Sequence, residues 1–132
     1  MKLNNKTVLL AFCLFFAGLV GCTSTYDENG SYKESKVNQE VPIPANAKPS
    51  EAHFSNPNIK KGKKYNLDNI GGEQGLYRPK EYFEEMKIWG WEELKNQQMG
   101  SIYFFEKDET IISIDIKENY FQLFEMKEDY EF

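Results

Sequence analysis

The sequence predicts an α+β fold in two layers, with one helix packed on a mostly antiparallel sheet, in the order β-α-β-β-β-β. Two observations predict it. Three consecutive C-terminal segments alternate apolar and polar residues with a period of two, as strands do. An earlier segment repeats its apolar residues with the helical period. With 132 residues, 40% of them hydrophobic, the chain is long enough for one such domain.

The first expected strand covers residues 64–67, and the helix covers residues 79–89. Proline suits the first helical position, held here by Pro79, and glycine suits the position just past the end, held by Gly90. One apolar stripe runs along this helix, formed by Tyr82, Phe83, Met86 and Trp89. Ile88 lies off the stripe. A short strand at residues 91–95 and a turn near residues 96–98 are expected next.

The C-terminal region predicts a three-stranded meander. Its strands cover residues 99–107, 110–117 and 120–126. Two-residue turns at 108–109 and 118–119 would join them, although neither has the glycine that such turns prefer, so slightly longer loops remain open. With two-residue turns, a single register pairs Phe105 with Ile112 and places seven residues on one face. These are Tyr103, Phe105, Ile112, Ile114, Ile116, Phe121 and Leu123. We expect the helical stripe to cover this face.

The first 21 residues have the pattern of a secretion signal. Lys2 and Lys6 make the start positive, and residues 8–20 form an unbroken run of 13 apolar or small residues. At about 1.5 Å per residue, a helix of this run is too short for a hydrocarbon core roughly 30 Å thick. Residues 1–21 therefore fit a signal peptide.

The apolar run leads into Leu19-Val20-Gly21-Cys22, which resembles the lipobox of bacterial lipoproteins. The resemblance implies cleavage between Gly21 and Cys22, a lipidated Cys22, and a domain held by the membrane on its extracytoplasmic face. Two acyl chains hold a protein on a bilayer where one is marginal. An ordinary signal peptide cut nearby and an uncleaved anchor are the alternatives.

Cysteine usage agrees with this interpretation. Cys13 leaves with the signal and Cys22 is consumed by lipid, so the mature chain has no free thiol and no disulfide. His53 is then the only soft ligand, and we expect no metal and no cofactor.

Residues 22–40 are expected to be the lipidated N-terminus and a flexible tether, and residues 41–132 the globular domain. The stretch 23–40 contains no Leu, Ile, Phe or Met, so it has little apolar surface to offset the entropy of ordering. The three prolines in residues 41–50 favour an extended spacer.

The charge balance disfavours general nucleic-acid binding. The net charge is −5, and removing the first 21 residues leaves 14 basic and 21 acidic residues, or −7. Such a surface repels phosphate backbones. The basic cluster "KKGKK" at residues 60–64 is expected to be a solvated hairpin tip, with anionic headgroups or wall polymers as the alternative ligands.

The second face of the meander is the candidate partner surface. Its apolar residues are Ile102, Phe104, Ile111, Tyr120, Phe124 and Met126. An exposed apolar patch of this size would mark a binding site. We expect instead that the segment from residue 42 to residue 67 folds over it, or that strand twist hides part of it; if the patch is exposed, it is the best candidate for a partner or dimer surface.

Catalytic patterns are weak. "GGEQG" at residues 71–75 lacks the Lys-Ser/Thr of a phosphate loop and is expected to be a turn. The acidic pairs are Glu84/Glu85, Glu92/Glu93 and Glu128/Asp129. Neighbouring acids point apart on a helix or a strand, so we do not expect these to be catalytic. Trp91 is expected in the core rather than stacked on a sugar ring.

The helix "PKEYF…WGW" and the strand "MGSIYFFEKD" also resemble those of small uncharacterised lipoproteins of low-GC Gram-positive bacteria, over residues 42–126. That resemblance implies no activity. The leading hypothesis is a lipid-anchored extracytoplasmic interaction module, non-enzymatic and accessory to an envelope protein or complex. The alternatives are a wall-polymer enzyme using paired carboxylates and an immunity or exclusion lipoprotein.

Overall fold

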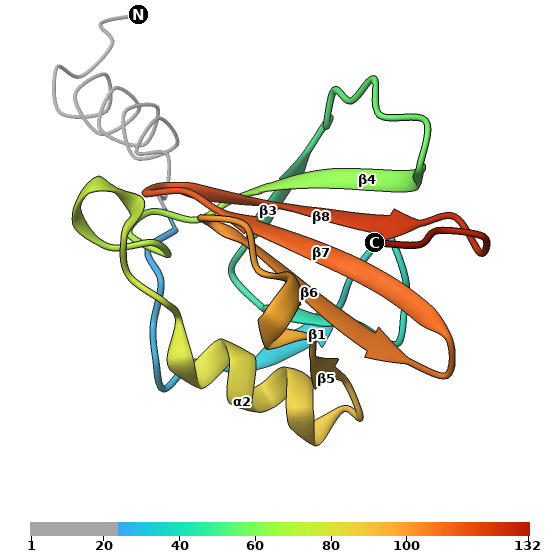
Figure 1. Ribbon diagram of the computed structural model, residues 1–132. Helices are drawn as coiled ribbons and strands as arrows, with labels where there is room; N and C mark the ends of the chain where they lie inside the picture. Colours follow the sequence, from blue (N-terminus) through green and yellow to red (C-terminus); the bar gives the residue numbers. More distant parts are fainter. Residues whose placement is uncertain (1–23) are drawn as a thin grey trace, which may run out of the picture.

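The computed structural model describes residues 24–132, so the expected cleavage and lipidation residues, Gly21 and Cys22, lie outside the described residues. The described chain forms one α-helix, α2 (Lys80–Ile88), and eight strands in two antiparallel sheets. The fold is therefore α+β and dominated by its sheets (Figure 1). No helix among residues 24–132 is long and apolar enough to cross a membrane.

Six strands form the main sheet. In spatial order they are β3 (Lys48–Ser50), β4 (Ile59–Asn66), β8 (Tyr120–Met126), β7 (Thr110–Ile116), β6 (Ile102–Lys107) and β5 (Glu92–Glu93). The expected register is confirmed, since Phe105 pairs with Ile112 and Ile116 pairs with Phe121. The last strand of the chain lies in the middle of the sheet, between β4 and β7.

Both turns of the meander have two residues. Asp108 and Glu109 have φ angles of 48° and 68°, the left-handed values that such a turn needs, although neither is glycine. In the second hairpin the Lys117 N–H donates to the Tyr120 carbonyl at 2.9 Å. The short turns are confirmed, and the longer loops are not needed.

Helix α2 covers the inner face of the meander, as expected. All seven predicted inner residues are buried, and the ring of Phe83 meets those of Tyr103 and Phe105 edge-on at 4.8 and 5.1 Å. Tyr82 packs against Phe121 in the same way at 5.6 Å. Ile88, predicted off the stripe, is 75% exposed.

The helix boundaries differ from the prediction by one residue at each end. Pro79 precedes the first helical residue, although its carbonyl already accepts the Phe83 N–H at 3.1 Å. Trp89 caps the helix and is half-buried. Gly90 follows with a φ of 96°, which confirms the predicted left-handed glycine.

The prediction of a flexible tether is wrong for residues 24–40. Within them β1 (Tyr32–Glu34) pairs with β2 (Pro42–Pro44) in the small sheet, and Val37 is buried in the core. The Lys36 N–H donates to the hydroxyl of Tyr65 at 2.9 Å. The composition of this segment gave a wrong prediction because its few apolar residues, Val37, Tyr26 and Tyr32, pack in or against the core. Backbone hydrogen bonds to the rest of the domain stabilise the segment further. The structured domain thus includes residues 24–40 as well as residues 41–132.

Two predicted strands differ from expectation in their length. Strand β4 is longer than the predicted strand at 64–67 and contains the lysine cluster, so this cluster is not a hairpin tip. Strand β5 has only two residues and is followed by a 3₁₀ turn, η2 (Lys95–Gln97). The "GGEQG" segment is a turn, as predicted, and holds the short 3₁₀ element η1 (Glu73–Gly75). Three short strands, β1 to β3, precede the first strand that the sequence predicted.

Candidate functional site

The predicted partner face lies on the outer side of the main sheet. Phe104 and Met126 are buried there, and the other four predicted residues are half-buried. The ring of Phe132 lies edge-on to Phe104 at 5.0 Å, and the ring of Phe54 lies edge-on to Phe124 at 5.7 Å. Two segments outside the meander therefore cover part of this face. The expectation that residues 42–67 fold over it is confirmed in part, through Phe54.

Gly62 explains how the β4 side of this face closes. It sits opposite Phe124 in the pairing of β4 with β8, and a Cβ at Gly62 would lie 2.5 Å from Cδ1 of that ring. The absence of a side chain lets Phe124 lie over the strand, with Phe54 above it. Nearby, the Lys64 ammonium lies 4.1 Å from the centre of the Tyr120 ring. The predicted face is thus partly closed.

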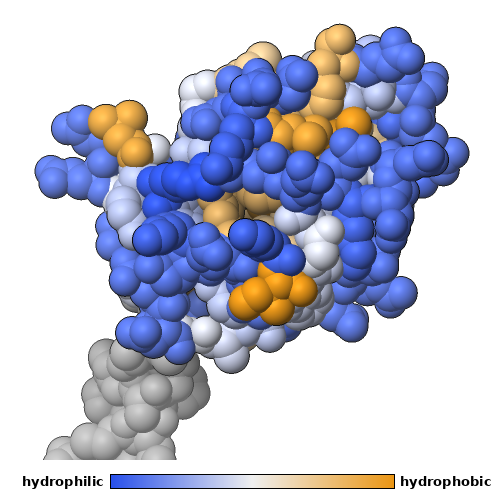
Figure 2. Space-filling model, turned by 60° about the horizontal axis from the view of Figure 1, so that its bottom comes forward, coloured by the Kyte–Doolittle hydropathy of each residue, from blue (hydrophilic) through white to orange (hydrophobic). Residues whose placement is uncertain are grey.

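A groove that the sequence did not predict lies between helix α2 and strand β5. Its volume is about 960 Å³. Its apolar floor consists of Phe83, Trp91 and Phe105, all buried. Its charged rim consists of Arg78, Lys80, Glu84, Lys87, Glu92, Glu93 and Lys95. Figure 2 turns the α2 side of the molecule forward and shows hydrophobic surface set among hydrophilic residues.

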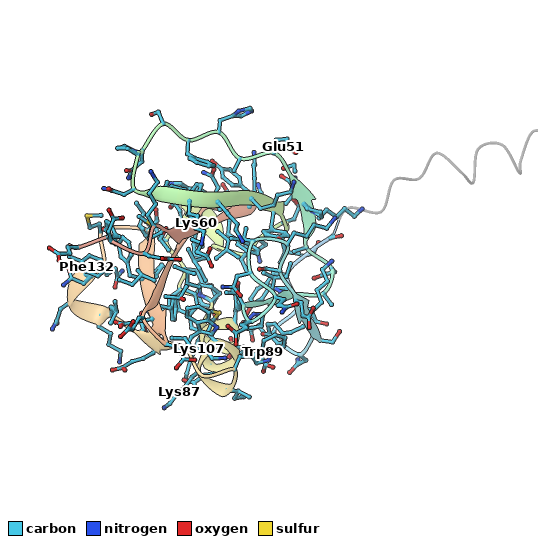
Figure 3. All side chains as sticks on the ribbon, turned by 90° about the vertical axis from the view of Figure 1, so that its right-hand side faces the viewer. Glu51, Lys60, Lys87, Trp89, Lys107 and Phe132 are labelled. Atoms are coloured by element: carbon cyan, nitrogen blue, oxygen red, sulfur yellow. The ribbon has the colours of Figure 1, made fainter. Side chains whose placement is uncertain are left out.

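Trp91 belongs to the core, as predicted. Its indole N–H donates to the Glu40 carbonyl at 2.8 Å, which joins the groove floor to the N-terminal segment. At the far end of the helix, the Lys107 ammonium donates to the Trp89 carbonyl at 2.9 Å and pairs with the Glu40 carboxylate at 3.5 Å. Lys107 and Trp89 lie side by side in Figure 3. The floor and this end of the groove are therefore held in place.

A two-point ion pair lies in the rim of the groove. The Arg78 guanidinium donates to both carboxylate oxygens of Glu93, at 2.6 and 2.5 Å. It also lies over the rings of Phe83 and Tyr103, at 4.7 and 5.4 Å from their centres. The hydrogen bonds from Arg78 to Glu93 raise the pKa of Arg78 above its ordinary value. The chain just before the helix is thereby tied to the edge of the sheet through Arg78.

Strand β5 is the open edge of the main sheet beside this groove. The Leu94 N–H donates to the Phe104 carbonyl at 2.8 Å. Because hydrogen-bonding groups alternate sides along an antiparallel strand, the N–H and C=O of Glu93 point away from β6. The opposite edge of the sheet, β3, contains Pro49, which has no N–H to offer.

The predicted acidic pairs are engaged in structural contacts or lie on the surface. Glu93 is paired with Arg78, and Glu85 accepts the indole N–H of Trp89 at 3.0 Å. Glu128 is exposed and lies 3.7 Å from the Lys60 ammonium. Among residues 24–132, no group of three or more His, Cys, Asp or Glu side chains is arranged to hold a metal ion.

Comparison of the chain with protein-family models, with curated proteins and with solved structures gives no match.

Proposed function

We propose that this chain is a lipid-anchored interaction module on the extracytoplasmic face of the cell membrane, non-enzymatic and accessory to an envelope protein or complex. The anchor part of the proposal is supported by the sequence, through the apolar run at residues 8–20 and the lipobox pattern that ends at Cys22. The interaction part is supported by the groove between α2 and β5.

The single observation that carries the interaction part is that an apolar groove lies directly beside an unpaired sheet edge. An extended peptide that adds a strand to an open edge gains main-chain hydrogen bonds, and a neighbouring pocket selects its side chains. Here Glu93 offers the main-chain groups, and the groove offers the ring of Tyr77, which is 42% exposed, beside a floor of Phe83, Trp91 and Phe105 that is itself almost fully buried. We propose an extended segment of an envelope protein as the occupant.

The charges of the rim indicate which charge the bound segment should have. Arg78 and Glu93 neutralise each other, while within the described chain Lys80, Lys87 and Lys95 form no ion pair. Two exposed carboxylates, of Glu84 and Glu92, face these three lysines. The rim is therefore slightly basic on a domain that is acidic overall, and it favours an apolar side chain flanked by acidic residues.

Site-specific crosslinking in cells tests the interaction. A photoreactive residue at Lys95, in the full chain, should give a discrete adduct with an envelope protein. Glu84→Trp should abolish the adduct, because residue 84 faces the groove and the indole would fill it. Ile88→Trp is the matched control, since residue 88 lies on the same helix outside the groove and is exposed. No adduct, or an adduct that survives Glu84→Trp, would contradict the proposal.

A second experiment tests the anchor. The mature protein should begin at an acylated Cys22, as read by mass spectrometry of its N-terminal peptide. A Cys22→Ser form should lose the lipid and leave the membrane fraction. Unchanged fractionation and processing of that form would overturn the anchor.

A further inference from the structure

Ser24 lies two residues after the proposed lipid attachment site and is already hydrogen-bonded to the folded domain. The Ser24 carbonyl accepts the Asp68 N–H at 2.8 Å, and the Tyr26 N–H donates to the Asp68 carbonyl at 2.8 Å. Between them, Thr25 pairs with Asp68 in a parallel bridge. The backbone is thus fixed to the loop that follows β4 from Ser24 onward.

This start point changes the distance between lipid and protein. Two residues span at most about 7 Å when fully extended. A flexible tether of eighteen residues would instead allow about 25 Å. If Cys22 carries lipid, the end of the domain that contains Ser24 and Asp68 rests against the bilayer.

The same end carries the most exposed large apolar side chain of the described chain. Leu76 is 83% exposed, and Tyr77 beside it is 42% exposed. The loop that presents them is held at both sides: the Tyr77 N–H donates to the Gly71 carbonyl at 2.7 Å, and the Gly71 N–H donates to the Glu118 carbonyl at 3.3 Å. The Tyr77 hydroxyl also donates to the Glu28 carboxylate at 3.2 Å. This loop, the β7–β8 turn and the start of the described chain lie together in Figure 1.

We infer that this end of the domain is a membrane-contact surface, in which Leu76 inserts into the boundary between headgroups and acyl chains. The inference rests on the proposed lipidation of Cys22, because one leucine alone would not hold a protein on a bilayer. The short connection makes the insertion intramolecular, so a weak apolar contact becomes populated. The contact fixes the orientation of the domain as well as its height above the membrane.

The carboxylates at this end disfavour recognition of a specific anionic headgroup. Glu73 and Glu118 are exposed beside the loop, whereas Lys117 is engaged with Asp115 at 3.4 Å and with the Ser101 hydroxyl at 3.2 Å. Repulsion between such carboxylates and anionic lipids falls off over about 8 Å at physiological salt. The contact is therefore apolar, and a zwitterionic bilayer should support it at least as well as an anionic one.

A fluorescent label can report the contact, because the mature lipidated protein has no free thiol of its own. Leu76→Cys and Ile88→Cys are each labelled with nitrobenzoxadiazole in the full lipidated protein, in phosphatidylcholine vesicles with and without phosphatidylglycerol. Both positions are highly exposed, so neither change disturbs the core. Residue 88 lies at the far end of α2, about 12 Å along the helix from its first turn. The label at 76 should show a blue-shifted emission and quenching by spin-labelled lipids, and the label at 88 should show neither.

Lengthening the connection gives the matched test of cause. Twelve Gly and Ser residues inserted between Thr23 and Ser24 would let the domain move about 20 Å from the anchor. The quenching at 76 should then be lost. Quenching that persists, or a label at 76 as exposed to water as the label at 88, would overturn the inference. A protein that lacks lipid at Cys22 would instead overturn the proposed function, so mass spectrometry of each sample distinguishes the two failures.

Discussion

Arg78 and Glu93, two rim residues of the groove, bind each other through two nearly equal hydrogen bonds of 2.6 and 2.5 Å. The pair joins the chain just before α2 to the edge strand β5, and the guanidinium stacks on Phe83. The Glu93 side chain is 11% exposed and that of Arg78 is 41% exposed, so solvent screens the pair in part.

Arg78→Lys should therefore cost about 1 kcal/mol of unfolding free energy, because a lysine cannot reproduce the two-point geometry or the stacking. Glu93→Gln should cost a similar amount. In a double-mutant cycle read by urea denaturation, the double variant should lose less than the sum of the two single variants. Strict additivity would show that the pair contributes nothing to stability.

The N-terminal segment should be essential to the fold. A chain that begins at Val41 loses the core side chain of Val37, the Lys36 N–H bond to Tyr65, and the Glu40 carbonyl that accepts the Trp91 indole. We expect a loss of several kcal/mol, since each orphaned buried partner alone costs about 1–3 kcal/mol. Denaturation of this chain, compared with one that begins at Ser24, measures the loss. Equal denaturation midpoints for the two chains would show that residues 24–40 are a tether that adds nothing to the stability of the domain.

Gly62 should resist any side chain. In Gly62→Ala the new Cβ would lie 2.5 Å from the Phe124 ring, and neither the strand nor the ring, which is packed against Phe54, can move freely. Overpacking of this kind costs about 1–3 kcal/mol. Thermal or urea unfolding would measure it, and Phe124→Leu in the same chain should recover part of the loss. A Gly62→Ala variant as stable as the original chain would contradict the close approach of Phe124 to this strand.

Stability should fall in alkali because of buried tyrosines. Burial raises the pKa of Tyr82 well above its ordinary value of 10.0, and it also raises the pKa of Tyr65. Each of these phenols is neutral in the folded protein and ionises more easily once the chain is unfolded. Its contribution to the free energy of unfolding is therefore fully present below pH 10 and is lost as the pH rises toward the folded-state pKa. The Tyr82 hydroxyl donates to the Pro42 carbonyl at 2.9 Å.

Tyr82→Phe separates the two roles of that hydroxyl. It should lower the stability at pH 7 by about 1 kcal/mol, through the lost hydrogen bond. It should also make the decline in stability above pH 10 less steep, because one titrating group is gone. Denaturation midpoints between pH 7 and pH 11 test both effects, and an unchanged slope would exclude Tyr82 as a source of the decline.

The predicted parts of the fold are those whose pattern is local. The alternation in the meander and the stripe on α2 each identify one face of one element, and these faces meet with Phe83 against Tyr103 and Phe105. The missed strands, β1 to β3, have three residues each, too few for a period to be visible. Their position depends on partners far away in sequence, such as Tyr65 for Lys36.

The groove escaped prediction for a related reason. The sequence predicted a strand at residues 91–95, just before the meander in the chain, and β5 lies within that range and pairs with β6. It could not show that β5 has only two residues and leaves space beside α2. The pairing of Arg78 with Glu93 is likewise invisible before the helix and the edge strand are placed together.

The central place of β8 has a consequence for how the chain is made. Strand β4 pairs with β8, and β8 pairs with β7, so the two halves of the main sheet are joined only through the last strand of the described chain. Because a polypeptide is made from its N-terminus, β3 and β4 cannot join β5, β6 and β7 in one sheet until residues 120–126 have been synthesised. Closing such distant contacts is slow compared with forming local ones. If the chain is exported as proposed, its main sheet can therefore be completed only once residues 120–126 have followed the rest of the chain across the membrane.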